Sequence, residues 1–226
     1  MGRDNLKHAV NAEYGAAPGR GLIDKWLSLQ RRKLFDAFMQ FRQGSPDDKV
    51  LNLYMKPTAL FDNSDYLVAM CDLAQRAHIT SCEMRPPDAD KRGLRLPYAD
   101  GEFDWVFCNE VLEHAGSAER QYVLVQELYR VARKGVFLTT ENRRHPLEFK
   151  TGIPFLHMLP ERAWRRLLKW LGKGKWASEA MLNPVDSRAL YRFASLLPGK
   201  PAHDVGHKRL FGIKAHFFLM IPKRKS

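Results

Sequence analysis

The sequence predicts an α/β fold built on a mostly parallel sheet, and the main observation is a strand–helix–strand pattern within residues 94–140. A nearly continuous apolar run from Phe103 to Cys108 indicates a buried strand. Apolar residues at helical spacing follow from Ala118 to Arg133, and Lys134-Gly135 then supplies the cation and glycine typical of a helix end. Val136–Thr140 is the next predicted strand. Such a unit belongs to a parallel sheet that helices cover on both faces.

Segments on either side of this unit extend the predicted sheet. Val50–Tyr54 and His78–Glu83 are predicted strands that lie parallel to the first pair. Between them, Ser64–Ala77 is a predicted helix with Ser64 as its N-cap. Near the end of the chain, His203–Phe211 and Lys214–Pro222 are predicted to form two strands joined by a turn. The last of these, over Lys214–Ile221, is expected to run antiparallel to the rest.

Length and pattern together predict one main domain with additions. A chain of 226 residues is long enough for one well-packed domain and hardly for two. After a loose leader, apolar residues at helical spacing begin near Leu22 and end near Gly44, so residues 1–48 are interpreted as an N-terminal helical extension. The main domain is predicted over residues 49–222. Residues 151–200 are predicted to form a helical cap inserted before the closing strands.

Charge and cysteine content restrict the class of partner and compartment. The chain has 37 basic and 25 acidic residues, a net charge of +12, which favours an anionic partner such as nucleic acid, a membrane surface or a phosphorylated substrate. Its three cysteines are too few and too scattered for a disulfide framework or a paired-cysteine metal site. Apolar runs fall short of the roughly 20 residues that span a bilayer. We therefore expect a cytoplasmic protein, with membrane association as an open alternative.

The residues around the strand–helix–strand unit resemble a known family. Three motifs carry the resemblance: Leu-Pro-Tyr-x-Asp-Gly-x-Phe-Asp-x-Val from Leu96, Val-Leu-Glu-His from Val111, and Glu-Leu-x-Arg-Val from Glu127. Their order and spacing resemble the second half of a class I S-adenosylmethionine-dependent methyltransferase of the small-molecule branch. The resemblance implies a three-layer Rossmann-like sheet, mostly parallel with a terminal antiparallel strand. Because few residues separate Glu83 from Leu96, the family's third strand is predicted to be missing or vestigial.

The resemblance also implies a site for S-adenosylmethionine at the carboxyl ends of the strands. In the family, an acidic residue ends the first strand and a glycine-rich loop follows it. Here Asn52 stands at the acidic position, and Tyr54, Lys56 and Thr58 stand at the glycine positions. Glu83 stands where the family places the acid that binds the ribose hydroxyls, with a solvated carboxylate as the alternative. The predicted cofactor contacts are Asn52, Tyr54, Glu83, Met84, Leu96, Cys108 and Asn109.

Polar residues after two strands are candidates for contact with a substrate. The segment after Thr140 leaves the carboxyl end of a strand, which is the ligand-binding edge of open α/β sheets. Asn142, Arg143 and Glu148 are the predicted substrate contacts in this segment, together with His114 after the preceding strand. His145 is the candidate base if the methyl acceptor must lose a proton. The alternatives are a hydrogen-bonded loop and, for His114, a structural role within the fold.

A basic amphipathic helix is predicted over Glu161–Trp176. Trp164, Leu167, Leu168 and Leu171 share one face of it. Such a helix suits contact with a membrane surface or an anionic lipid head group, whereas a polynucleotide needs cations along a longer track. The alternative is a solvated charged face above a stripe that packs on the core. The predicted cationic face consists of Arg162, Arg165, Arg166, Lys169, Lys173 and Lys175.

These features together predict S-adenosylmethionine-dependent methyl transfer to a small or lipid-linked anionic metabolite. Methyl transfer releases a neutral thioether, so it depends mainly on holding donor and acceptor in line and needs no fixed catalytic constellation. The altered glycine positions leave an alternative, a catalytically inactive relative that serves as a binding or partner protein. No His-Glu-x-x-His or paired Cys-x-x-Cys spacing occurs in the sequence, so no metal ion is expected.

Overall fold

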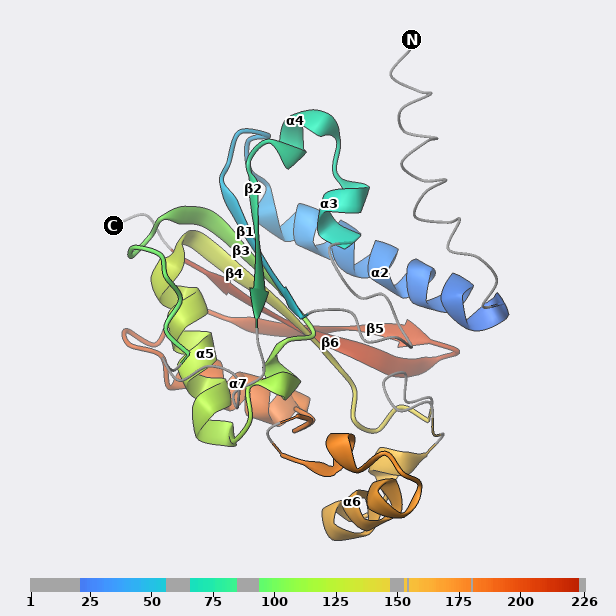
Figure 1. The fold of residues 1–226 in the computed structure, drawn as a ribbon. Helices are drawn as coiled ribbons and strands as arrows, with labels where there is room; N and C mark the ends of the chain where they lie inside the picture. Colours follow the sequence, from blue (N-terminus) through green and yellow to red (C-terminus); the bar gives the residue numbers. More distant parts are fainter. Residues whose placement is uncertain are drawn as a thin grey trace.

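One six-stranded sheet organises the molecule (Figure 1). The computed structural model describes residues 21–55, 66–84, 94–146, 153, 155–179 and 181–223. The strand order is β2-β1-β3-β4-β6-β5. The strands are β1 (Val50–Met55), β2 (Ile79–Met84), β3 (Phe103–Asn109), β4 (Ala132–Glu141), β5 (Asp204–Leu210) and β6 (Ile213–Pro222). The first four are parallel to one another and β6 runs antiparallel to β4 and β5, which confirms the predicted sheet.

The centre of the sheet is the pair that the sequence pattern predicted. Strand β3 is buried along its whole length and pairs in parallel with β4, with Val106 opposite Val136 and Cys108 opposite Leu138. Strand β2 has β1 as its neighbour at one end of the strand order. Within the described residues between β2 and β3, which are 94–102, no strand occurs. The prediction of a missing or vestigial third strand agrees with this topology.

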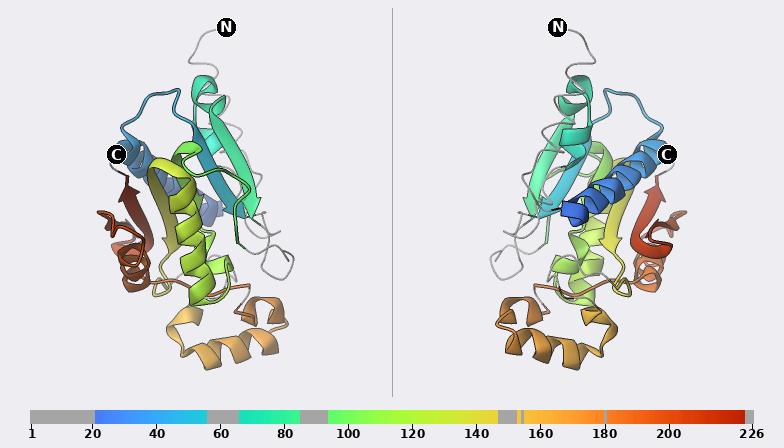
Figure 2. Two further views of the ribbon diagram at one scale, coloured as in Figure 1. Left: turned by 90° about the vertical axis from the view of Figure 1, so that its left-hand side faces the viewer. Right: turned by 90° about the vertical axis from the view of Figure 1, so that its right-hand side faces the viewer.

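Helices cover both faces of the sheet, as Figure 2 shows. Helix α2 (Gly21–Arg42) packs on one face through an aromatic layer in which Phe38 contacts Phe107 at 4.9 Å and Phe137 at 5.6 Å between ring centroids. Helices α5 (Ala118–Val131) and α7 (Ser187–Ser195) bury their apolar sides in the core on the other face. Since side chains alternate along a strand, Trp105, Phe107 and Phe137 face α2, whereas Val106, Cys108, Val136 and Leu138 face α5.

The predicted helix over Ser64–Ala77 is wrong in its continuity. Ser64 lies outside the described residues, and the rest forms two short helices, α3 (Tyr66–Met70) and α4 (Leu73–Arg76). Asp72 lies between them and is the N-cap of α4, where it forms a capping box. Its carboxylate accepts from the Gln75 amide at 2.8 Å, and the Gln75 side chain accepts from the Asp72 amide at 3.2 Å. Such a box satisfies N–H groups that a new helix leaves free, so it favours a break here.

The predicted helix end at Lys134-Gly135 is also wrong, because α5 ends at Val131 and both residues lie in β4. Lys134 forms ion pairs from β4, because its ammonium lies 2.6 Å from Asp48 and 3.2 Å from Asp104. The small size of Gly135 is required by the residues packed around it. A Cβ at this position would lie 2.8 Å from Trp105 Cζ3 and 3.1 Å from the Ile221 carbonyl oxygen.

The region between β4 and α7 forms a small helical unit of its own. It contains the 3₁₀ helices η3 (Leu156–Met158) and η4 (Gly174–Ala177) around α6 (Glu161–Trp170). Trp164 and Leu168 of α6 are buried in its local core. The prediction that this helix runs to Trp176 is wrong, since the backbone turns at Gly172, whose φ is +72°. Among the described residues, no helix is long and apolar enough to cross a membrane.

Candidate cofactor and substrate site

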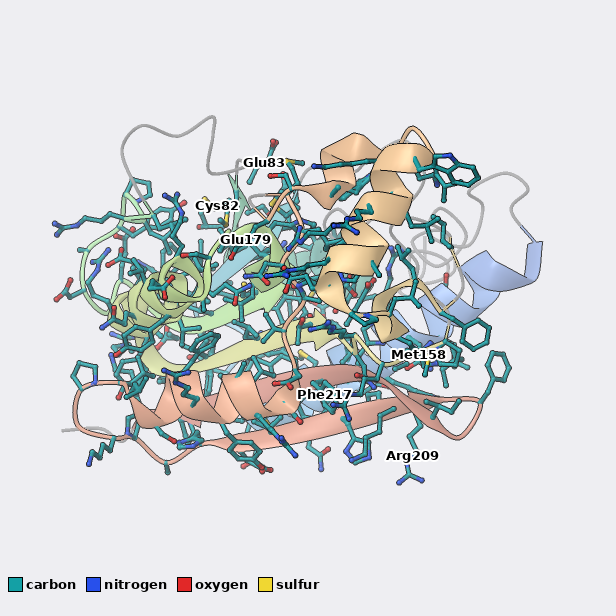
Figure 3. All side chains as sticks on the ribbon, turned by 90° about the horizontal axis from the view of Figure 1, so that it is seen from below. Cys82, Glu83, Met158, Glu179, Arg209 and Phe217 are labelled. Atoms are coloured by element: carbon teal, nitrogen blue, oxygen red, sulfur yellow. The ribbon has the colours of Figure 1, made fainter. Side chains whose placement is uncertain are left out.

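The parallel strands end at one edge of the sheet, and α6 lies beyond this edge (Figure 1). Figure 3 looks onto the same edge, with Glu83 of β2 at one end of it and Phe217 of β6 toward the other. The register of β1 and β2 places Tyr54 opposite Glu83 and Met55 opposite Met84. On the other side of β1, Leu53 lies opposite Cys108. Topology therefore brings together the predicted cofactor residues of three strands.

The environments of these residues differ. Glu83 is exposed and Tyr54 is half-buried, so both can reach a ligand at the edge, while Met84 is buried among the aliphatic residues of the core. Asn52 is 1% exposed, and its amide donates to the Ser81 hydroxyl at 3.3 Å. Its side chain thus joins two strands within the sheet. Lys56 and Thr58, at the altered glycine positions, lie outside the described residues.

Leu96 is held in place by two residues of α5, and this contact explains two of the sequence motifs. The Leu96 amide donates to the Glu127 carboxylate at 2.9 Å, and Arg130 donates to the Leu96 carbonyl at 3.1 Å. Burial alone would raise the pKa of Glu127, but its hydrogen bonds with Arg130 and the Leu96 amide lower the pKa below its usual value. The segment that leads into β3 is therefore fixed against α5 by a charged pair.

The residues at the end of β3 are buried and hydrogen-bonded. The Asn109 side-chain oxygen accepts from the Thr139 hydroxyl at 2.8 Å and from the Tyr66 hydroxyl at 3.2 Å. Burial raises the pKa of the Cys108 thiol, and the neighbouring Glu113 carboxylate raises this pKa further. A thiol that keeps its proton is a poor nucleophile, so Cys108 contributes packing at this edge.

Three of the candidate substrate residues make contacts within the fold. The His114 Nδ1 atom lies 2.6 Å from the Met181 carbonyl oxygen, which fastens the turn after β3 to the segment after η4. Asn142 donates from its side chain to the Lys214 carbonyl at 2.6 Å and accepts from the Arg144 amide at 3.0 Å. His145 is buried, with its amide bonded to the Asn142 carbonyl at 2.9 Å. These contacts favour the structural alternative for His114 and Asn142.

The other two candidates are placed less fully. Arg143 is half-buried in the turn after β4. Glu148 lies outside the described residues. The roles of all five residues, including His145 as a base, stay predictions.

Sequence reasoning missed a cluster of three titratable side chains at the same edge. Glu110 follows β3, Glu141 ends β4 and His216 lies in β6, and one ligand-type atom from each lies within 4.8 Å of the others. The His216 Nε2 atom is 3.3 Å from a carboxylate oxygen of Glu110. The only indication in the sequence is a histidine inside a mainly apolar strand. Its partners follow from the strand register, which pairs Glu141 with His216.

The fold is that of an open α/β sheet, a class of protein in which ligands bind at the carboxyl ends of the strands. Residues 44–140 match a family model described as a methyltransferase domain. The matched segment contains the motifs from Leu96 to Arg130, so it supports the class I S-adenosylmethionine-dependent methyltransferase resemblance. Methyl transfer is the reaction class that the match supports, and S-adenosylmethionine is the cofactor that it implies.

Comparison with solved structures gives distant likenesses. A Methanosarcina mazei S-adenosylmethionine-dependent methyltransferase is 10% identical, with a TM-score of 0.41 over 83% of this chain and 96% of that one. An Archaeoglobus fulgidus methyltransferase of the same kind is 10% identical, with a TM-score of 0.46 over 87% and 94%. These likenesses carry no argument about activity. No curated protein matches the sequence.

Proposed function

We propose that the chain is an S-adenosylmethionine-dependent methyltransferase whose cofactor lies against β1, β2 and β3 at their carboxyl edge. The observation that carries the proposal is the exposed Glu83 carboxylate, which the strand register places beside Tyr54 within the segment that matches a methyltransferase domain. A carboxylate can accept hydrogen bonds from two neighbouring hydroxyls, as ribose offers them.

The fit of the cofactor differs between the strands. At β2 it is good, because the exposed Glu83 carboxylate lies near the carboxyl end of this strand. At β1 it is poorer, because Asn52 is engaged with Ser81 and offers no charge to order the loop that follows. Glu83, Leu96 and Asn109 are the residues that would surround the cofactor. S-adenosylmethionine, when bound there, would supply the methyl group on its sulfonium.

The acceptor that we propose is a small or lipid-linked anionic metabolite, and α6 supports this choice. Arg162, Arg166 and Lys169 are exposed on α6, and Trp170 is 81% exposed at its end. We call these four residues the α6 outer face. Cations beside an exposed indole suit an anionic lipid head group, because the indole enters the interface while the cations meet phosphate.

The other predicted cations do not belong to the α6 outer face. Arg165 is turned into the fold: its guanidinium lies 2.9 Å from Glu161 and donates to the Ala177 carbonyl at 2.8 Å. Lys173 is half-buried and follows the end of α6, and the Lys175 side chain lies outside the described residues. The apolar stripe of Trp164 and Leu168 is buried in the local core, which is the structural alternative for that stripe.

The deciding experiment is calorimetric titration of the full chain with S-adenosylmethionine and, separately, with S-adenosylhomocysteine. We expect saturable binding of both ligands with one site per chain. Adenosine serves as the control ligand, because it offers the ribose and base without the amino-acid part that the altered loop would contact. If none of the three binds at millimolar concentration, the proposal is wrong.

The substitutions at the glycine positions favour a second candidate function, a catalytically inactive binding or partner protein. Side chains at Tyr54, Lys56 and Thr58 disfavour the close backbone approach that a glycine-rich loop gives. The titration distinguishes the two candidates: binding of adenosine without any gain from the amino-acid part would favour the inactive relative.

A further inference from the structure

We propose that Glu110, Glu141 and His216 bind one divalent transition-metal ion at the carboxyl edge of the sheet. The three ligand-type atoms lie within 4.8 Å of one another, and His216 Nε2 is 3.3 Å from a Glu110 carboxylate oxygen. Among the described residues, no other group of histidine, cysteine and acidic side chains brings three ligand-type atoms this close together. The inference goes beyond methyl transfer and does not depend on it.

The fold builds the cluster from β4, β6 and the residue that follows β3. His216 and Glu141 are partners in the antiparallel β4–β6 register, so their side chains leave the sheet on the same face. Phe218 lies two residues further along β6 and packs in the α2-side core, which identifies this face as the one that α2 covers. Glu110 is brought to it by a left-handed backbone, with φ of +51°, and its amide donates to the Thr139 carbonyl at 3.1 Å.

The donor set selects the kind of ion. One imidazole nitrogen and two carboxylates suit Zn²⁺, Mn²⁺ or Fe²⁺, whereas Mg²⁺ and Ca²⁺ prefer oxygen ligands alone. Bonds of about 2.0–2.2 Å place the donors of a tetrahedral ion about 3.4 Å apart. Side chains within 4.8 Å of one another therefore need only small rotations to reach a shared ion.

Charge and burial support the same conclusion. His216 is 2% exposed and Glu110 is 8% exposed, so little water screens the site. Two carboxylates this close in a poorly solvated place repel each other, and a divalent cation beside a neutral imidazole balances both. Glu141 is only half-buried, which leaves one side of the site open to a water molecule or a ligand.

The competing explanation is a Glu110–His216 ion pair with Glu141 close by and no ion. Three protein ligands and an open side are enough for saturable metal binding, whereas an ion pair alone gives none. The two explanations also differ for Glu141, because it is a ligand in the first and a neighbour in the second.

The test uses the full chain after treatment with a chelator, titrated calorimetrically with ZnCl₂, MnCl₂ and MgCl₂ in separate runs. We expect one Zn²⁺ or Mn²⁺ per chain, bound at least about tenfold more tightly than Mg²⁺. Electron paramagnetic resonance of added Mn²⁺ gives a second measure, because bound Mn²⁺ loses the sharp spectrum of the free ion. Neither measurement needs cofactor or activity, so the result stands apart from the proposed function.

Three variants test whether the ion binds at these residues. Glu141→Gln and His216→Gln each remove one ligand and should weaken Zn²⁺ binding at least about tenfold. Glu179→Gln is the matched control, an exposed carboxylate in the segment after η4, and should bind as the wild type does. Circular dichroism checks that each variant folds, and if His216→Gln does not fold, Glu141→Gln decides alone. The proposal is overturned if the wild type binds none of the ions at about 1 mM. Wild-type affinity in Glu141→Gln would overturn it equally.

Discussion

Arg130 and Leu96 are joined across 34 positions of sequence by a hydrogen bond of 3.1 Å from the guanidinium to the Leu96 carbonyl oxygen. The same guanidinium donates to the Tyr98 carbonyl at 2.8 Å and pairs with Glu127 at 2.7 Å. The motifs beginning at Leu96 and at Glu127 are thus two halves of one contact. Their co-occurrence in the sequence has a structural cause, since α5 fixes the segment that leads into β3.

Replacing Arg130 by methionine should lower the free energy of unfolding by about 2–3 kcal/mol, because Glu127 and two carbonyl groups lose a charged donor. Urea unfolding followed by circular dichroism measures the change. Arg188→Met is the control, since Arg188 is exposed on α7, and it should change stability by less than about 0.5 kcal/mol. Equal effects of the two changes would contradict the structural role of Arg130.

Asp104 should make stability depend on pH. Burial by itself raises the pKa of this carboxyl, but hydrogen bonds from Arg133, from the Lys49 amide and from Lys134 bring the pKa below its usual value. A lowered pKa stabilises the folded state above the unfolded pKa of about 3.9, and the stabilisation is lost as pH falls through the folded value. Urea unfolding between about pH 6 and pH 3 should therefore show a steeper loss for the wild type than for Asp104→Asn. Parallel curves would show that Asp104 contributes nothing to the dependence.

Gly135→Ala should destabilise the fold by about 1–3 kcal/mol, the usual cost of overpacking. The added Cβ would lie 2.8 Å from Trp105 Cζ3 and 3.1 Å from Phe41 Cζ, and both rings pack in the aromatic layer against one another. Thermal unfolding measures the loss. Gly174→Ala is the control, because the nearest atom to its Cβ would be Lys169 Cγ at 3.9 Å. A wild-type melting temperature for Gly135→Ala would show that the layer can adjust.

Gly135 also shows where sequence reasoning reaches its limit. The strands over Phe103–Cys108 and Lys214–Pro222 were predictable, because long apolar runs depend little on their surroundings. Lys134-Gly135 has the composition of a helix end, yet residues distant in sequence determine both positions. Lys134 pairs with Asp48, and Trp105 leaves no room for a side chain at Gly135. Local patterns contain no information on such tertiary contacts.

The residues of the candidate site also differ in how far the sequence alone could predict them. Glu83 could be placed at the edge from its position at the end of a strand and from family resemblance. The group of Glu110, Glu141 and His216 could not, because the β4–β6 register brings Glu141 to His216 and the backbone turn after β3 adds Glu110. Metal-site motifs in sequence describe ligands on one helix or one loop. A site assembled by sheet topology has no such spacing.

Glu83→Ala should weaken the binding of S-adenosylhomocysteine by roughly 1.5–3 kcal/mol, the range for hydrogen bonds to a charged group. Isothermal titration calorimetry measures the change. Glu102→Ala is the control, an exposed carboxylate in the turn before β3, where it accepts from the Ala99 amide at 2.7 Å. An unchanged affinity in Glu83→Ala would leave Glu83 as a solvated carboxylate, and the position of the ribose would have to be sought elsewhere on the edge.

The α6 outer face should bind anionic membranes through charge and one indole. Changing its three cations to glutamine should cost about 1 kcal/mol of membrane binding for each, and the loss should shrink as salt rises. Co-sedimentation with phosphatidylserine-containing liposomes measures binding, and Trp170→Ala tests the indole separately. The matched control removes the same charge from exposed positions on and after α7, namely Arg188, Arg192 and Lys200.

The control separates a defined surface from net charge. The whole chain carries +12, so any anionic surface attracts it to some degree, and both triple variants lose that general attraction equally. Only a contact made by α6 itself gives a larger loss for Arg162, Arg166 and Lys169 than for the control set. If the two variants lose binding equally while the wild type shifts RNA at physiological salt, the lipid proposal is wrong. The excess charge then serves a polynucleotide, whose phosphates need cations along a longer track than one short helix provides.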